Sequence, residues 1–159
     1  METLKELHLI HSWLGLFHTL TAVLAMIFGT LVLFKIKGTK THKILGYAYV
    51  INMLLLNGSA FGIYNFGTFS MFHFFAIVSL LSVLMGFYPV FARIKNWYRK
   101  HFYFMNWSVV GLYCAFWAEI GVRFFDMKYF WWVVMLATMF TSYIGARLIN
   151  KQAKALNLN

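Results

Sequence analysis

Two long runs without charged residues constrain this chain more than any other feature of its sequence. No Lys, Arg, Asp or Glu lies from Leu7 to Phe34, and none lies from Ile44 to Ala92. A helix needs about 20 apolar residues to cross a bilayer, so the first run accommodates one span and the second accommodates two. Only 11% of the residues are charged and 62% are hydrophobic, too little polar surface for a soluble domain. The chain is therefore predicted to be an integral membrane protein.

Turn signals and charges divide the chain into five predicted helices. Asn65-Phe66-Gly67-Thr68 is a turn signal near the middle of the second run, and charges from Arg93 to Lys100 end that run. We therefore predict an all-α fold, a single transmembrane domain over residues 1–159 with five transmembrane helices. Their predicted ranges are 9–34, 44–64, 69–91, 102–122 and 129–147.

The basic residues predict how the chain is oriented. Most of its 14 Lys and Arg lie in 35–43, in 93–100 or from Arg147 onward, whereas the N-terminal segment carries Glu2 and Glu6. By the positive-inside rule, both basic turns and the C-terminus are cytoplasmic and the N-terminus is outside. We expect a multi-pass protein of the bacterial plasma (inner) membrane, with the lipid bilayer as its partner. The net charge of +10 is interpreted as this orientation signal, not as nucleic-acid binding, because no basic face with its own readout is present.

The two basic turns repeat a pattern that involves histidine. Each turn is followed by a histidine, and each is preceded by a histidine inside the upstream apolar run. In chain order these four residues are His18, His42, His73 and His101. The repeat predicts two hairpins of the same orientation that form a four-helix core, with the last helix peripheral.

Helix geometry predicts the depth of these histidines. If the first helix meets the inner boundary at Phe34, His18 lies about 24 Å up a core of about 30 Å. His73 lies at a matching depth, about 6 Å below the outer boundary. His42 and His101 lie at the inner boundary, where a histidine is also commonly an interfacial anchor.

Paired neutral imidazoles are the axial ligands of b-type haem. We therefore predict His18 and His73 as an outer pair and His42 and His101 as a candidate inner pair. Haem b at these positions makes the chain a membrane electron-transfer protein with a redox partner. The sequence predicts no catalytic residue, and it leaves open whether the chain is itself a transmembrane oxidoreductase.

A single metal ion is the alternative cofactor. His18, His73 and Glu119 are predicted at similar depth, and His11 lies on the same helix face as His18, so these nitrogen and oxygen donors suit zinc or iron. Glu119 can instead pair with Arg123 one helical turn away. The corresponding alternative function is a non-redox accessory or assembly subunit of a membrane complex, with at most one metal ion in its outer half.

Short motifs carry a resemblance to one known family, and the order of the histidines carries a resemblance to another. The motifs are the Gly/Lys turn that ends in His42, the segment Ser59-Ala60-Phe61, and the helix starts Phe72-His73 and His101-Phe102. Together, over residues 10–125, they resemble a bacterial family of predicted membrane proteins, a domain of unknown function (DUF2306 type). The order and depth of the four histidines are similar to those of the ascorbate-dependent di-haem transmembrane cytochromes of the b type. In those proteins four successive helices carry one ligand each, but they have six helices, whereas five are predicted here.

Overall fold

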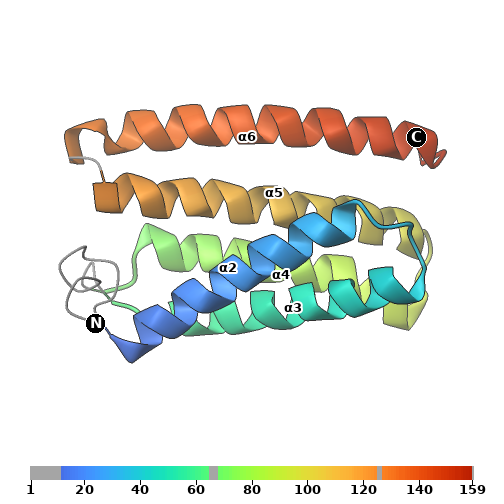
Figure 1. The fold of residues 1–159 in the computed structure, drawn as a ribbon, viewed down its shortest axis with the longest axis horizontal. Helices are drawn as coiled ribbons and strands as arrows, with labels where there is room; N and C mark the ends of the chain where they lie inside the picture. The colour runs from blue at the N-terminus through green and yellow to red at the C-terminus, as the bar shows by residue number, and fades with distance from the viewer. Residues whose placement is uncertain (1–11, 65–67, 125–126, 159) are drawn as a thin grey trace. The chain divides into compact units, whose positions relative to one another are not determined.

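The computed structural model describes residues 12–64, 68–124 and 127–158. These residues form five α-helices and no β-strand, so the prediction of an all-helical chain is confirmed (Figure 1). The helices are α2 (Trp13–Leu33), α3 (Lys40–Ala60), α4 (Met71–Ala92), α5 (Trp97–Phe124) and α6 (Met127–Ala155).

The number of helices suited to crossing a membrane differs from the prediction. By length and apolar composition, three described helices can do so: α2, α4 and residues Lys128–Ala155 of α6. Five were predicted because the charge-free runs were long. However, α3 begins at Lys40 and carries Asn52 and Asn57, and α5 carries Asn106 and Glu119. Polar residues of this kind make a helix less favourable in hydrocarbon, which is why these two helices fall short.

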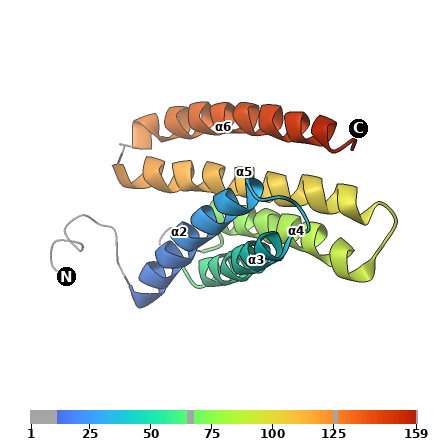
Figure 2. The same cartoon turned by 45° about the vertical axis from the view of Figure 1, so that its right-hand side comes forward.

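The chain divides into two compact units, Met1–Leu81 and Ser82–Asn159, and the boundary falls within α4. In the first unit, α2 and α3 lie side by side, joined by the turn after Phe34 (Figures 1 and 2). Ala25 on α2 and Tyr49 and Met53 on α3 are fully buried. The small residues Ala25 and Gly29 are both buried on α2, so its packed face allows close approach of a neighbouring helix.

In the second unit, α6 runs alongside α5 (Figures 1 and 2). A Cβ built on Gly145 would lie 2.5 Å from Val110 Cγ2, so only glycine permits this approach of α6 to α5. Trp117 Nε1 also donates a hydrogen bond to Thr141 Oγ1 at 3.1 Å. The last helix, predicted to be peripheral, therefore has a specific interface with α5.

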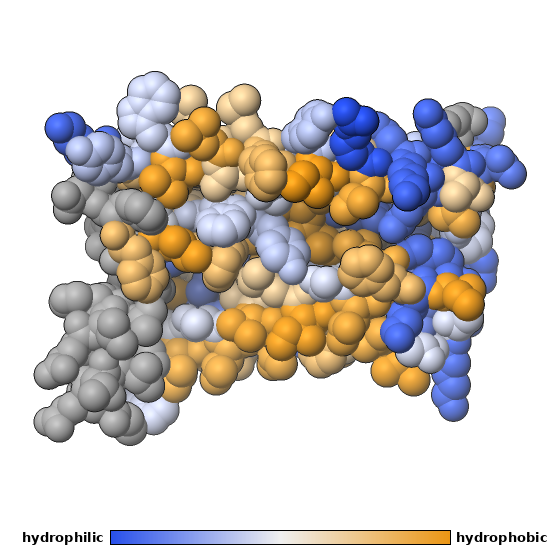
Figure 3. All heavy atoms as spheres, turned by 45° about the horizontal axis from the view of Figure 1, so that its top comes forward, coloured by the Kyte–Doolittle hydropathy of each residue, from blue (hydrophilic) through white to orange (hydrophobic). Residues whose placement is uncertain are grey.

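The outer surface of α6 is apolar along much of its length and hydrophilic toward its C-terminal end (Figure 3). Trp132, Met139 and Phe140 are each about two-thirds exposed, whereas the polar end carries Arg147, Lys151 and Lys154. An exposed apolar surface of this size is typical of a helix that faces lipid or another membrane protein. The positive charges of α6 therefore lie in its C-terminal part, beyond its apolar surface.

Candidate functional site

His18 is half-buried on α2, and its tautomer is determined by a serine on α3. His18 Nδ1 lies 3.0 Å from Ser59 Oγ. The single hydroxyl proton of Ser59 is donated to the Leu56 carbonyl at 2.9 Å, so Ser59 Oγ accepts from His18 Nδ1–H. In the neutral ring Nε2 then carries the lone pair. Histidines that bind a metal through Nε2 are commonly held in this way, with the other ring nitrogen hydrogen-bonded to the protein.

His101 shows the same tautomer on α5. Its Nδ1 lies 2.9 Å from the carbonyl oxygen of Gly86, which can only accept, so Nδ1 is the protonated nitrogen. The lone pair again lies on Nε2 in the neutral ring. His101 and Gly86 both belong to the second unit. At Gly86, α4 lies close to α5, since a Cβ built on this residue would lie 3.1 Å from Met105 N. The close approach places the carbonyl within reach of the imidazole.

His73 has the opposite tautomer. The backbone N–H of Ser70 donates to His73 Nδ1 at 3.1 Å, and Ser70 Oγ lies 2.9 Å from the same nitrogen. Because Nδ1 accepts, the proton of the neutral ring is on Nε2, which therefore lacks the lone pair that a metal ligand needs. His73 is 3% exposed, and its Nε2 has no hydrogen-bond partner in the described part of the chain. The geometry thus disfavours His73 as a ligand through Nε2.

The contacts of His73 are those of a helix cap. Ser70 immediately precedes α4, and His73 is the third residue of that helix. A side chain at this position that accepts from the backbone N–H of the capping residue makes one half of a capping box, usually with Glu or Gln. Rings of Tyr64 and Phe69 lie against the imidazole, with centroids at 4.9 and 5.2 Å.

His42 also occupies the third position of its helix, α3. Its backbone N–H donates to Thr39 Oγ1 at 3.3 Å, and its side chain is half-buried. The turn before it is held by Gly38 at φ +81° and by Lys37, whose Nζ donates to the carbonyl of Leu33 at 3.0 Å. Burial lowers the pKa of the Lys37 ammonium. Specific hydrogen bonds in this turn therefore hold the end of α2 and the start of α3.

The contacts of the four histidines leave both predicted pairs untested. His18 and His73 lie in the first unit and contact different serines, whereas His42 belongs to the first unit and His101 to the second. The pairing of His42 with His101 stays a prediction. The structural repeat stays a prediction too: His42 is the third residue of α3 and His101 is the fifth of α5.

The metal alternative is not supported by the described residues. Among them, no three His, Cys, Asp or Glu side chains form a group able to hold a metal ion, and His18, His73 and Glu119 are all described. His11 lies outside the described residues, as does the side chain of Arg123, the predicted partner of Glu119.

Sequence reasoning missed the oxygen partners of the imidazoles. Ser59, Ser70 and the Gly86 carbonyl determine the tautomers, yet none was identified as a histidine partner. The Ser70-x-x-His73 and Thr39-x-x-His42 spacings would have identified the two capping positions, since Ser or Thr three residues before a polar side chain is a helix-start signal. No local signal identifies Ser59 or Gly86, which reach their histidines from another helix.

Comparison with known proteins places the chain in a family. No curated protein and no solved structure matches it. One family model, described as a predicted membrane protein, matches residues 15–150, which include all five described helices in whole or in part. The apolar helices and the family description agree that the chain is a membrane protein. The chain belongs to the family of predicted membrane proteins DUF2306.

Proposed function

We propose that this chain is a haem-binding membrane electron-transfer protein in which His18 and His101 would each hold haem through Nε2. The observation that supports the proposal is the tautomer of both rings, since each donates Nδ1–H to an oxygen of the fold. Haem-ligating and metal-ligating histidines are commonly held in this way, because the second hydrogen bond orients the ring and raises its basicity. Haem b would supply reversible one-electron transfer.

The proposal changes the role of one predicted ligand. His73 caps α4 through Nδ1 and is not among the proposed ligands, whereas His42 remains a candidate for the inner half. His18 and His101 are treated as two separate ligands, each tested independently. Ser59 and the Gly86 carbonyl are their positioning partners.

The same proposal includes an orientation in the bacterial plasma membrane. Both basic turns and the C-terminal end of α6 face the cytoplasm and the N-terminus faces outward. The support is the distribution of Lys and Arg, which gathers at 35–43, at 93–100 and after Arg147.

The absorption spectrum of the purified protein tests the function. After expression with ample haem, the protein should show a Soret band and reduced α and β bands. His18→Ala and His101→Ala should each lower the bound haem, while His73→Gln, which keeps a capping acceptor, should retain it. Helical content by circular dichroism controls for folding. A wild-type protein without a Soret band, or undiminished haem in both alanine variants, would overturn the proposal.

A second candidate, favoured by the exposed surface of α6, is an accessory or assembly subunit of a membrane complex. Trp131 and Trp132 are 51% and 65% exposed, and the apolar surface continues along the helix. Such a surface fits a membrane partner as well as lipid. A protein that lacks haem but co-purifies in a defined stoichiometric complex from its native membrane would favour this function over the first.

A further inference from the structure

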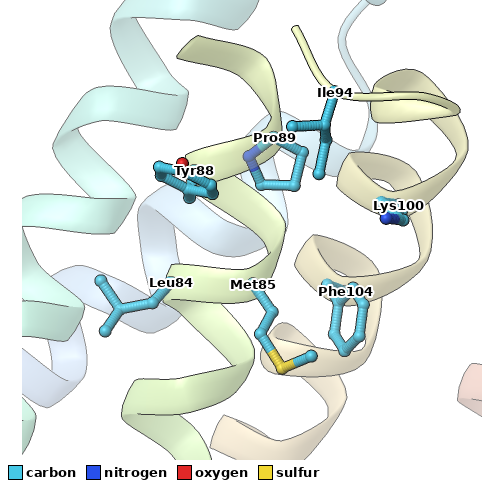
Figure 4. A pocket seen from close by; sticks show the side chains of 7 residues that line it. All are labelled: Leu84, Met85, Tyr88, Pro89, Ile94, Lys100 and Phe104. Atoms are coloured by element: carbon cyan, nitrogen blue, oxygen red, sulfur yellow. The ribbon is translucent and has the colours of Figure 1, made fainter. Parts of the chain in front are cut away.

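An apolar groove lies between α4 and α5 in the second unit, and neither His101 nor its partner Gly86 lines it. Its volume is about 350 Å³. Four of its side chains come from α4, two from α5 and one from the turn between them (Figure 4). They are Leu84, Met85, Tyr88, Pro89, Ile94, Lys100 and Phe104.

The local backbone explains why the groove opens here. At Gly86, α4 and α5 are in close contact, since a built Cβ would lie 2.8 Å from Met105 Sδ. Three residues further along α4, Pro89 lacks the N–H that would otherwise bond to the Met85 carbonyl. The turn that follows contains Arg93 and Asn96, both at positive φ, before α5 begins. The groove thus lies between a tight helix contact and the basic turn.

The lining of the groove is almost wholly apolar, so Lys100 lines it with its hydrocarbon chain. The Lys100 ammonium lies at the edge of the groove and is unpaired in the described part of the chain. No hydrogen bond, ion pair or ring contact engages the Lys100 ammonium there. The neighbouring Arg93 and Arg99 differ, because their guanidinium groups lie over the rings of Trp97 and Tyr103, at 4.8 and 5.9 Å. No acidic residue occurs between Leu7 and Ala118. The Lys100 ammonium therefore borders the groove, and no acidic residue lies near it in the sequence.

We propose that this groove binds an anionic phospholipid, with its acyl chain against Leu84, Met85 and Phe104 and its phosphate on Lys100. Apolar walls bordered by a single cation match a ligand that is hydrocarbon over most of its length and anionic at its head. The groove lies near the Ala92 end of α4, a helix suited to crossing the membrane, and next to the basic turn. Lipid headgroups occupy this boundary between hydrocarbon and charge. Inorganic phosphate would satisfy Lys100 but leave the apolar walls exposed.

Native mass spectrometry of the full-length protein in detergent tests the site. The protein is titrated separately with phosphatidylglycerol, phosphatidylcholine and inorganic phosphate, and the affinity for each is measured. We expect one phosphatidylglycerol to bind more tightly than phosphatidylcholine. Lys100→Gln should weaken phosphatidylglycerol binding about five-fold, as expected for one basic residue near a membrane surface, and leave phosphatidylcholine unchanged. Lys100→Arg should retain binding.

Two matched variants separate the groove from general surface effects. Lys95→Gln removes a charge from the same turn outside the groove and should change binding by less than two-fold. Leu84→Trp fills the groove and should weaken both lipids, whereas Leu81→Trp places the same ring on the exposed surface of α4 outside it. Equal effects of Lys100→Gln and Lys95→Gln, equal effects of the two tryptophans, or full displacement of the lipid by inorganic phosphate would each overturn the proposal. A dimer of the chain that forms with no bound lipid would also overturn the proposal.

Discussion

The residue that donates to or accepts from a histidine determines which ring nitrogen carries the lone pair of the neutral imidazole. The histidines of this chain therefore have different roles. His18 and His101 donate through Nδ1, which puts the lone pair of the neutral ring on Nε2, whereas His73 accepts at Nδ1 and caps a helix. Counting histidines and their depths does not separate these cases, because the distinction depends on the atom opposite each nitrogen.

His73 gives a prediction that separates capping from ligation. His73→Ala removes the acceptor for the Ser70 N–H and should lower the free energy of unfolding by about 1 kcal/mol. His73→Gln, which offers an amide oxygen at the same helix position, should recover most of that loss. Unfolding in mixed micelles, followed by circular dichroism, measures both. A glutamine variant no more stable than the alanine variant would contradict the capping role.

Ser59 gives a second prediction, which rests on the proposed function. Ser59→Ala leaves His18 Nδ1–H without its acceptor and should destabilise the fold by about 1 kcal/mol. If His18 ligates haem, the same change should weaken haem binding about ten-fold, the lower end of what losing such a partner costs. Ser79→Ala, a half-buried serine on α4, is the control and should change neither quantity. Haem titration of the purified protein gives the affinity, and an unchanged haem affinity in Ser59→Ala would contradict the positioning role.

At the scale of helices, the sequence predicted the number and order of elements better than their ends. The charge-free runs predicted helices that begin after the basic turns, at 44 and 102, whereas α3 and α5 begin at Lys40 and Trp97. The physical reason is that capping, not charge, decides where a helix starts. Thr39 accepts from the His42 N–H, and Lys40 and Lys43 then lie within the first turn of α3.

Packing of α6 on α5 gives a prediction at this scale. Gly145→Ala introduces a Cβ that would lie 2.5 Å from Val110 Cγ2, so the two helices must shift apart, at a cost of about 1–3 kcal/mol. Gly111→Ala is the matched control on α5, because a Cβ there meets nothing within 4 Å. It should be neutral or stabilise the helix by up to about 1 kcal/mol. Thermal unfolding in micelles compares them, and equal stability of the two variants would contradict the close contact.

For the whole molecule, composition was sufficient to predict a helical membrane protein, but not how many helices suit a bilayer. The prediction of five spans followed from the lengths between charges. The amides Asn52, Asn57 and Asn106 carry no charge, so that criterion ignored them, although they lower the apolar character of α3 and α5. Two of them are buried and donate within their own helices, Asn57 to the Met53 carbonyl and Asn106 to that of Phe102. Tertiary burial of this kind is not visible in a sequence.

The placement of the basic turns gives the last prediction. Segments 35–43 and 93–100 can both be cytoplasmic only if the chain between them crosses the membrane an even number of times. If α3 and α4 both cross, residue 64 lies outside while residues 41 and 92 lie inside. If α4 crosses alone, residues 41 and 64 share one side and residue 92 lies on the other. The positive-inside rule favours the first pattern, because the second exports the charges of Arg93 to Lys100.

Single cysteines distinguish the two patterns in a Cys114→Ala background. The three variants are Thr41→Cys, Tyr64→Cys and Ala92→Cys. The replaced residues are exposed and lie at the start of α3, between α3 and α4, and at the end of α4. A membrane-impermeant maleimide applied to intact cells should label only Tyr64→Cys, and all three should react after permeabilisation. Labelling of Ala92→Cys with protection of the other two would mean that α4 crosses without α3. That result would agree with the lower apolar character of α3, and it would show that the polar residues of α3 outweigh the positive charge of the second turn.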